Sequence, residues 1–243
     1  MVRAETTSPT PEPFDTGRLH KDLASLGYQF VYLPQTTSTM DNARAAGVIP
    51  TVVVTNHQTQ GRGRVGRNWH DTPGKSVLMT IAEPFNEVDG DPDGSSQLPH
   101  QLFTLAACLA LQEVTANKHI LIKWPNDLVY ADASQPDTFG KKIGGVLIEN
   151  PDHSPSHMYP RLFGLGVNVS YLPQETALLP AEYGAVSLSE ITAQPLDRSD
   201  IILAIVKRWS SLRTLLRQEN SMTTDIARLW HDNAAMLNKT VYV

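Results

Sequence analysis

Runs of apolar residues predict seven β-strands along the chain. Residues 51–55 read T-V-V-V-T, which is typical of a buried strand, and residues 28–33 are rich in β-branched and aromatic types. On the same grounds we predict strands over 28–33, 51–55, 76–82, 119–124, 128–130, 142–149 and 162–169, and the beginning of another over 240–243. The polar connection between 130 and 141 predicts that 128–149 forms a hairpin.

Helical signals lie between these strands. Apolar residues at 102, 105, 106 and 109 share one helical face, and Gly27 is a typical residue after a helix end. Ser38-Thr39-Met40-Asp41 resembles a capping box. We therefore predict helices over 16–26, 38–46, 102–116, 199–216 and 223–236. Because the strands cluster between helices rather than alternating with them, the pattern favours an α+β fold.

Two segments differ from this pattern. Residues 1–13 contain three prolines and few apolar residues, so we predict a flexible tail followed by one domain over 14–236. Residues 83–100 contain five acidic side chains, Glu83 first among them, and no lysine or arginine. We predict a solvated loop there.

Composition narrows the classes of protein that fit. The 243 residues are 41% hydrophobic and 19% charged, which is enough for a sizeable core and too little charge for general disorder. The net charge of −5 argues against broad binding to nucleic acid or anionic lipid. One cysteine, Cys108, excludes a disulfide framework and a Cys-rich zinc site, and fits a reducing cytoplasm. Neither a membrane-spanning run nor histidine spacing for a protein-built metal site is present.

The sharpest chemical signal is a glycine-rich basic segment, residues 60–75, which we call the basic glycine loop. It carries Arg62, Arg64, Arg67 and Lys75 against one Asp71, a local charge of +3 in an acidic protein. Glycines let backbone N–H groups approach an anion, so the loop predicts a phosphate or carboxylate site. A solvated basic turn is the alternative. A dinucleotide fingerprint and a P-loop both fit poorly, because no long helix can follow and the first P-loop glycine is missing.

Lys142 is the second candidate. It enters the apolar strand 142–149 beside Gly144 and Gly145, whose missing side chains would leave room for a ligand. Its neighbour Lys141 would face the opposite side. The alternative is a strand-end lysine that extends to solvent. Residues 123–127 and 164–168 could be an ordinary turn and a bulge.

Taken together, these segments resemble the biotin–protein ligase family, monofunctional type without a DNA-binding domain. The resemblance spans about residues 36 to 170. It is carried by Ser38-Thr39-Met40, Gln58, G-R-G-R-V-G-R-N-W over 61–69, K-W-P-N-D-L over 123–128, K-I-G-G-V-L-I-E over 142–149 and G-L-G-V-N over 164–168. The basic glycine loop followed by K-W-P-N-D is highly specific.

The resemblance implies a fold and a reaction. The fold would be a mixed, mostly antiparallel sheet flanked by helices, like that of class II aminoacyl-tRNA synthetases. Biotin's carboxylate would attack the α-phosphate of ATP, with Mg²⁺, to give biotinyl-5′-AMP and pyrophosphate. A lysine of a biotin carboxyl carrier domain of a carboxylase would then take the biotin and release AMP. Both reactants of the first step are anions, which fits a cationic loop that closes over the intermediate.

The resemblance also implies roles for single residues. Lys142, Arg64 and Asp127 would be catalytic: the lysine would bridge the biotin carboxylate and the α-phosphate, and the aspartate would orient or deprotonate the incoming amine. The biotin-binding residues would be Ser38, Thr39, Met40, Gln58, Arg62, Gly63, Arg64, Lys142 and Gly145. The ATP-binding residues would be Arg64, Arg67, Trp69, Asn126, Lys142, Gly166 and Asn168. Magnesium would arrive with ATP near Asn126, and Gly164 would be another position of close approach.

Two departures from the family pattern shape further expectations. About 35 residues precede Ser38, so we expect no helix-turn-helix and no DNA binding. Residues 237–243 look like the first strand of the small β-barrel that usually follows, so we expect that domain to be reduced or truncated. Two alternatives remain, a lipoate or octanoyl transferase of the same fold group and a non-catalytic biotin-sensing protein. A homodimer through exposed strand edges is possible.

Overall fold

The computed structural model describes residues 14–46, 50–84, 98–131, 139–150, 160–218 and 222–237. A seven-stranded sheet runs through them in the order β1-β2-β3-β7-β6-β5-β4. Only the β1–β2 pair is parallel among these strands. The strands are β1 (Gln29–Leu33), β2 (Thr51–Thr55), β3 (Ser76–Glu83), β4 (Ile120–Lys123), β5 (Asp127–Tyr130), β6 (Lys141–Glu149) and β7 (Arg161–Asn168).

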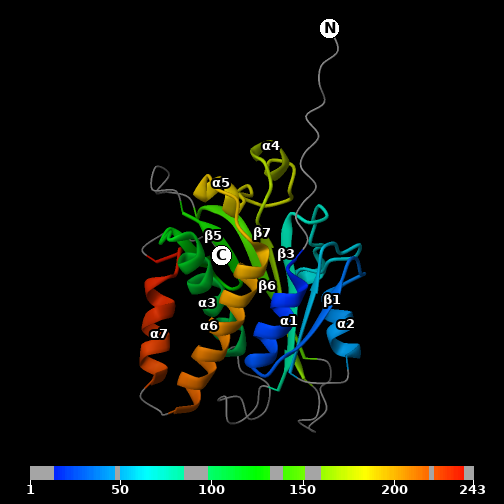
Figure 1. Cartoon of the computed structure of the whole chain (residues 1–243). Coiled ribbons are helices and arrows are strands. Elements are labelled where there is room, and N and C mark those ends of the chain that lie inside the picture. Colours follow the sequence, from blue (N-terminus) through cyan, green and yellow to red (C-terminus); the bar gives the residue numbers. More distant parts are fainter. Residues whose placement is uncertain are drawn as a thin grey trace.

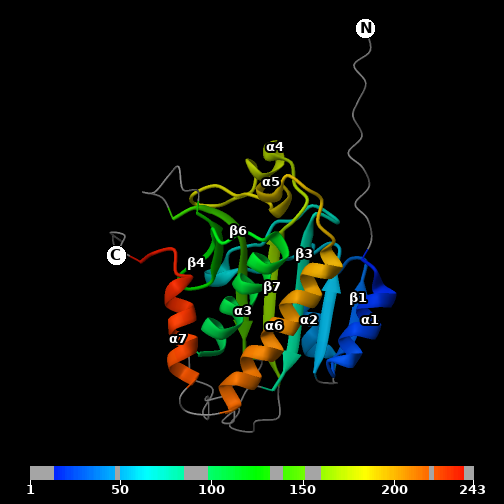
Figure 2. The ribbon, with the colours of Figure 1, turned by 60° about the vertical axis from the view of Figure 1, so that its left-hand side comes forward.

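The middle of the sheet is covered on both faces. Every residue of β2, β3 and β7 is buried, as their almost unbroken apolar runs predict. One face packs against α1 (Thr16–Ser25), α3 (Leu98–Thr115) and α6 (Arg198–Gln218), and α7 (Met222–Asp232) packs against α3 and α6. The four helices cover this side of the molecule in Figures 1 and 2. The centre of this core is Trp209, whose ring lies 5.2 Å from that of Phe103 and 4.7 Å from that of Phe163.

The opposite face has a thinner cover. Helix α2 (Thr39–Ala45) buries Met40 and Ala43 against a small cluster that includes Val53 and Leu162. Ser38 caps the helix, because its hydroxyl accepts a hydrogen bond from the backbone N–H of Met40. This short helix therefore sets its first turn, with Ser38 and Thr39, directly on the sheet.

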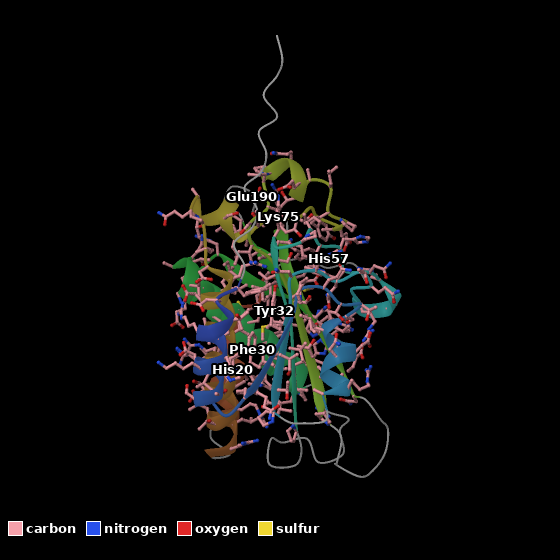
Figure 3. The ribbon with its side chains drawn as sticks, turned by 45° about the vertical axis from the view of Figure 1, so that its right-hand side comes forward. His20, Phe30, Tyr32, His57, Lys75 and Glu190 are labelled. Atoms are coloured by element: carbon pink, nitrogen blue, oxygen red, sulfur yellow. The ribbon has the colours of Figure 1, made fainter. Side chains whose placement is uncertain are left out.

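Two short helices sit at one end of the sheet. These are α4 (Pro173–Thr176) and α5 (Leu188–Thr192), which lie at the top of Figures 1 and 2. Figure 3 places the labelled His57 and Lys75 toward the same end as Glu190 of α5, and His20 nearer the opposite end. Neither helix was predicted, since four or five residues are too few for a periodic pattern. Their start signals, Pro173 and the capping box of Ser187 with Glu190, are visible in the sequence.

The mixed sheet flanked by helices is as predicted, and every predicted strand and helix within the described residues is present. Some boundaries were wrong. Helix α3 begins at Leu98, four residues before the predicted start, and α7 ends at Asp232 instead of 236. The predicted tail 1–13 and the predicted strand 240–243 lie outside the described residues.

Glu83 was placed in a solvated loop, and that prediction was wrong. It is the last residue of β3 and only 3% exposed. Arg213 forms an ion pair with its carboxylate at 2.8 Å, and Tyr28 and Trp209 donate hydrogen bonds to it. Burial raises the pKa of Glu83, and Arg213 opposes that shift. A carboxylate can end a buried strand here because partners from α6 satisfy it. Residues 85–97 of the predicted loop lie outside the described residues.

Strand β6 contains a bulge that decides which side chains meet. Val129 of β5 pairs with Lys142, but the preceding Leu128 pairs with Gly144, so Ile143 is an extra residue. Ile143 is fully buried in the main hydrophobic core. The bulge reverses the alternation of the strand, and Lys142 therefore shares a face with Gly145 rather than with Gly144.

Candidate functional site

A cavity of about 730 Å³ opens at the end of the sheet near α4 and α5. Its walls come from α2, β3, β5, β6 and β7, the basic glycine loop and the turn after β4. Every residue given a role or a close approach from the sequence lines it: Ser38, Thr39, Met40, Gln58, Arg62, Gly63, Arg64, Arg67, Trp69, Asn126, Asp127, Lys142, Gly145, Gly164, Gly166 and Asn168. Segments more than a hundred residues apart thus meet in one place, although their roles remain predictions.

One wall of the cavity is a buried polar cluster. Ser38 and Thr39 are 1% and 3% exposed. The Gln58 side-chain oxygen accepts hydrogen bonds from the Thr39 backbone N–H at 2.8 Å and from its hydroxyl at 3.1 Å. The Thr39 and Thr80 hydroxyls lie 2.8 Å apart. Buried hydroxyls and a half-buried amide held this way form a fixed pattern of donors and acceptors for a polar ligand. Thr80, on the fully buried strand β3, was not predicted.

The basic glycine loop lines the cavity, and its chain folds back on itself through two backbone hydrogen bonds. The Gly63 N–H donates to the Arg67 carbonyl at 2.7 Å, and the Trp69 N–H donates to the Gly61 carbonyl at 2.9 Å. Between them lies a single 3₁₀ turn, Arg64–Gly66. At its tip Val65 is 93% exposed and has a φ of 55°, an unfavourable conformation for a β-branched residue. The surrounding contacts therefore hold the loop in this shape.

Trp69 returns the loop to the sheet. A methyl group added at Gly166 of β7 would come within 2.6 Å of the Trp69 ring, so the indole packs flat against bare backbone. The Trp69 indole N–H and the Asn168 side-chain oxygen are buried without a protein hydrogen-bond partner. An unpaired buried donor and acceptor beside one cavity offer hydrogen bonds to a ligand with both kinds of group.

The cationic centre of the cavity is Lys142. Its Nζ lies 2.7 Å from Oδ1 of Asp127 on the neighbouring strand. A Cβ built at Gly145 would stand 3.5 Å from that Nζ and 3.3 Å from Oδ1 of Asp127, so the glycine leaves space beside the pair. Two backbone hydrogen bonds to Gly184 and Val186 secure Lys142 at its other edge.

The loop arginines are arranged differently from one another. A guanidinium nitrogen of Arg64 donates to the Asn126 side-chain oxygen at 3.3 Å, which links the loop to the K-W-P-N-D turn. Arg62 points away toward Asp41 and Glu149. Lys75 was counted among the cations of the loop, but it is 7% exposed and forms an ion pair with Glu175. Its charge is therefore compensated outside the cavity.

One side of the cavity was not predicted. Residues 179–185, between α4 and α5, line it together with Lys123 and Trp124. The Lys123 ammonium lies 4.2 Å from the centroid of the Tyr183 ring and 3.3 Å from Glu182. Hydrogen bonding by Tyr183, followed by the nearby charges of Lys123 and Arg67, lowers the pKa of Glu182. The segment has no motif that sequence reasoning could use.

His100, in the first turn of α3, is a neutral histidine. Burial, and then the charge of Arg64, lowers its pKa to about 4, and its Nε2 is buried without a partner. A pKa lower in the folded than in the unfolded state means that protons bind preferentially to the unfolded chain. The stabilisation is complete above pH 6.5 and is lost as pH falls toward 4.

We expect this loss to be visible in a comparison with His100→Phe, which cannot titrate. The free energy of unfolding of the wild type relative to the variant should fall between pH 6.5 and 4 and stay level between pH 7 and 8. Thermal or urea unfolding at several pH values measures it. A difference between the two proteins that does not change with pH down to 4 would contradict the prediction.

Among the described residues, no group of three or more His, Cys, Asp or Glu side chains is placed to hold a metal ion. Within the same part of the chain, no helix combines the length and hydropathy needed to cross a bilayer. Cys108 is buried, and burial raises the pKa of its thiol to about 12. It is therefore a packed thiol that lies apart from the cavity-lining residues.

The chain is similar to proteins of known function. A family model described as the biotin/lipoate A/B protein ligase family matches residues 32–168. The bifunctional ligase/repressor BirA of Bacillus subtilis is 32% identical over 191 residues, which cover 76% of this chain and 51% of that protein. The biotin–[acetyl-CoA-carboxylase] ligase of Mycobacterium tuberculosis is 28% identical over 80% of this chain and 69% of its own length. The chain thus spans about half the length of the first of these relatives.

Solved structures give the same picture. The biotin protein ligase of Aquifex aeolicus in complex with biotin and ATP superimposes with a TM-score of 0.62 at 26% identity, covering 81% of this chain and 76% of that one. The biotin protein ligase of Leishmania major in complex with biotin gives a TM-score of 0.67 at 23% identity, over 88% of this chain and 84% of that one. At 23% identity, the similarity to the Leishmania major structure shows the fold alone.

Proposed function

Because the chain belongs to the biotin/lipoate A/B protein ligase family, we propose that it is an ATP-dependent biotin–protein ligase. It would form biotinyl-5′-AMP from biotin and ATP and transfer the biotin to a lysine of a carboxylase carrier domain. The observation that carries the proposal is the meeting of Lys142, the basic glycine loop and the buried polar cluster in one cavity.

The chemistry of the first step suits this arrangement. A carboxylate must approach the α-phosphate of ATP, and both groups are negatively charged. The Lys142 ammonium can neutralise each of them and the charge that develops at phosphorus, and Arg64 and Arg67 line the same cavity. Asp127 holds that ammonium at 2.7 Å, so a positioning role for Asp127 accompanies its proposed part in orienting the incoming amine.

The polar wall suits the ring of biotin. A ureido group has two N–H donors and one carbonyl acceptor, which the hydroxyls of Ser38 and Thr39 and the amide of Gln58 can match. A lipoyl or octanoyl chain has no such groups and could not use the remaining hydrogen-bonding capacity of these side chains, whereas each bond that a ureido ring forms with them adds about 0.5–1.5 kcal/mol. The wall therefore supports biotin over the lipoate alternative.

The nucleotide would lie toward Trp69 and Asn168, whose unpaired donor and acceptor suit a base or ribose. Mg²⁺ would arrive with the phosphates of ATP. The side-chain oxygen of Asn126, a hard ligand of the kind that Mg²⁺ accepts, lines the same cavity. When bound, the ion would neutralise phosphate charge, and the residues of the chain would position the reacting groups around it.

One experiment separates ligase from sensor. The purified chain is mixed with biotin, ATP and Mg²⁺ and studied by native mass spectrometry, with parallel samples that lack ATP or biotin. We expect a bound mass equal to biotinyl-AMP in the complete mixture only. Bound biotin without the adenylate, in protein shown to be folded, would favour the non-catalytic alternative.

Substrate choice is tested separately. Titration calorimetry with biotin and with lipoate should show at least tenfold tighter binding of biotin, about 1.4 kcal/mol, because only biotin pairs with the polar wall. Gln58→Leu should reduce that preference. Tighter binding of lipoate would reject biotin as the substrate. The carrier domain, a homodimer, the absence of DNA binding and a cytoplasmic location remain predictions.

A further inference from the structure

Four charged residues close a ring between the basic glycine loop and the body of the protein. Arg62 lies 2.9 Å from Asp41 of α2 and 3.2 Å from Glu149 of β6. Arg44 of α2 completes the circuit, at 3.3 Å from Asp41 and 2.6 Å from Glu149. Charges alternate around this ion-pair ring, and each arginine contacts both carboxylates.

The direction of Arg62 is informative. Its neighbour in the loop Arg64 extends to Asn126 across the cavity, but the guanidinium of Arg62 is committed to two carboxylates of the protein. Burial alone would lower the pKa of Arg62, yet Asp41 and Glu149 raise it, so the arginine remains charged and paired. A guanidinium paired with two carboxylates is not available to bind a substrate anion.

The ring also joins the parts that form the two sides of the cavity. Asp41 and Arg44 belong to the helix that begins with the polar wall, and Glu149 ends the strand that carries Lys142. Breaking the ring would remove the ion pairs that tie the loop to both. The loop also has a strained tip, since Val65 adopts a positive φ, and a strained segment keeps its shape only where its surroundings hold it.

We propose that Arg62, Asp41, Arg44 and Glu149 act as a clasp that holds the basic glycine loop closed over the cavity. Arg62 is then a positioning residue and not a ligand of biotin through its side chain. The proposal deepens the proposed function, and in that respect rests on it: a closed loop would retain the acyl-adenylate until the acceptor amine arrives.

The strength of the clasp should be moderate and sensitive to salt. The four side chains are between 26% and 43% exposed, so single pairs are weak, and their joint arrangement has to provide the hold. Screening lengths fall from about 10 Å at 0.1 M salt to about 3 Å at 1 M. A latch of this kind can open once per turnover, which a deeply buried pair could not do readily.

The decisive measurement is tryptic cleavage inside the loop, which needs no enzymatic activity. Glu149→Gln preserves all cleavage sites and removes a carboxylate from both arginines. We expect cleavage after Arg64 and Arg67, followed by mass spectrometry, to be about tenfold faster than in the wild type, with an unchanged melting temperature. Raising the salt concentration should accelerate cleavage of the wild type and have much less effect on the variant.

Matched controls separate the clasp from a general loss of charge. Glu113→Gln removes a carboxylate that pairs with Arg208 at 2.5 Å on the helical face. Arg18→Gln is the control for Arg62→Gln, since Arg18 also contacts several carboxylates and is 43% exposed. Both controls should cleave at the wild-type rate. The double variant Arg62→Gln/Glu149→Gln should cleave no faster than either single one, because both remove the same ring.

Retention of the intermediate is measured in parallel. In Glu149→Gln the ratio of free to bound biotinyl-AMP should rise about tenfold. In Arg62→Lys the ratio should lie between those of the wild type and Glu149→Gln, because one ammonium cannot pair with both carboxylates as a guanidinium does. Cleavage of Glu149→Gln and Arg62→Gln at the rate of their controls would overturn the clasp. If the wild type forms no adenylate, the proposed function fails, and the cleavage rates alone decide the clasp.

Discussion

Replacing Lys142 by alanine should lower the rate of biotin-dependent ATP–pyrophosphate exchange by about 10²–10³-fold, the size seen when one preorganised charge-stabilising group is removed. The reason is the position of its ammonium between Asp127 and the cavity, where two anions must react. The side chain is 30% exposed, so its loss should leave the fold intact. Exchange at the wild-type rate would remove Lys142 from the mechanism.

The neighbouring lysine provides the control. Lys141 belongs to the same strand, is exposed and lies outside the cavity. Lys141→Ala should keep exchange within about twofold of the wild type, because it changes the net charge equally without touching the site. Equal losses in Lys141→Ala and Lys142→Ala would mean that overall charge, and not the placed ammonium, matters.

Gly144→Ala should destabilise the protein by about 2–3 kcal/mol, which lowers the melting temperature by about 4–12 °C in a chain of this size. A Cβ at this position would meet the Gly166 carbonyl oxygen at 2.5 Å and the Cα of Val167 at 3.2 Å. Both are backbone atoms of a central strand and cannot move aside easily. Thermal unfolding measures the effect.

Gly145→Ala is the matched comparison. The new methyl group would lie 3.3–3.5 Å from the ends of Asp127 and Lys142, which are side chains that can shift. We expect a melting temperature near that of the wild type and an exchange rate about tenfold lower. The two adjacent glycines thus separate stability from activity. The reverse outcome, with Gly145→Ala the less stable protein, would contradict the assignment of their faces.

The sequence allowed the sheet to be predicted because its central strands are almost purely apolar. The apolar runs over 51–55 and 76–82 indicate strands in a covered layer, and both are buried throughout. Glu83 was missed because its partners, Arg213 and Trp209, come from a helix more than 120 residues later. Burial of a charge depends on such distant partners, which local pattern does not show.

The membership of the cavity was predicted from motifs, but its details were not. Simple alternation along 142–149 would put Lys142 and Gly144 on one face. The extra residue Ile143 puts Lys142 with Gly145 instead. Lys75 was counted among the cations of the basic glycine loop, but its charge is paired with Glu175, which lies one hundred residues away in the sequence. Residues 179–185 line the cavity through packing alone, without a recognisable pattern.

The bulge in β6 divides the strand into two zones. After Ile143, positions packed against the helical core and the close backbone of β7, such as Gly144, alternate with positions that line the cavity, such as Gly145. Before Ile143, the requirement is that the Lys142 ammonium points into the cavity. Inserting or deleting one residue between the zones would turn that group toward the interior while leaving most of the sheet hydrogen bonds possible. Insertions or deletions at this point should therefore abolish activity while the sheet still forms.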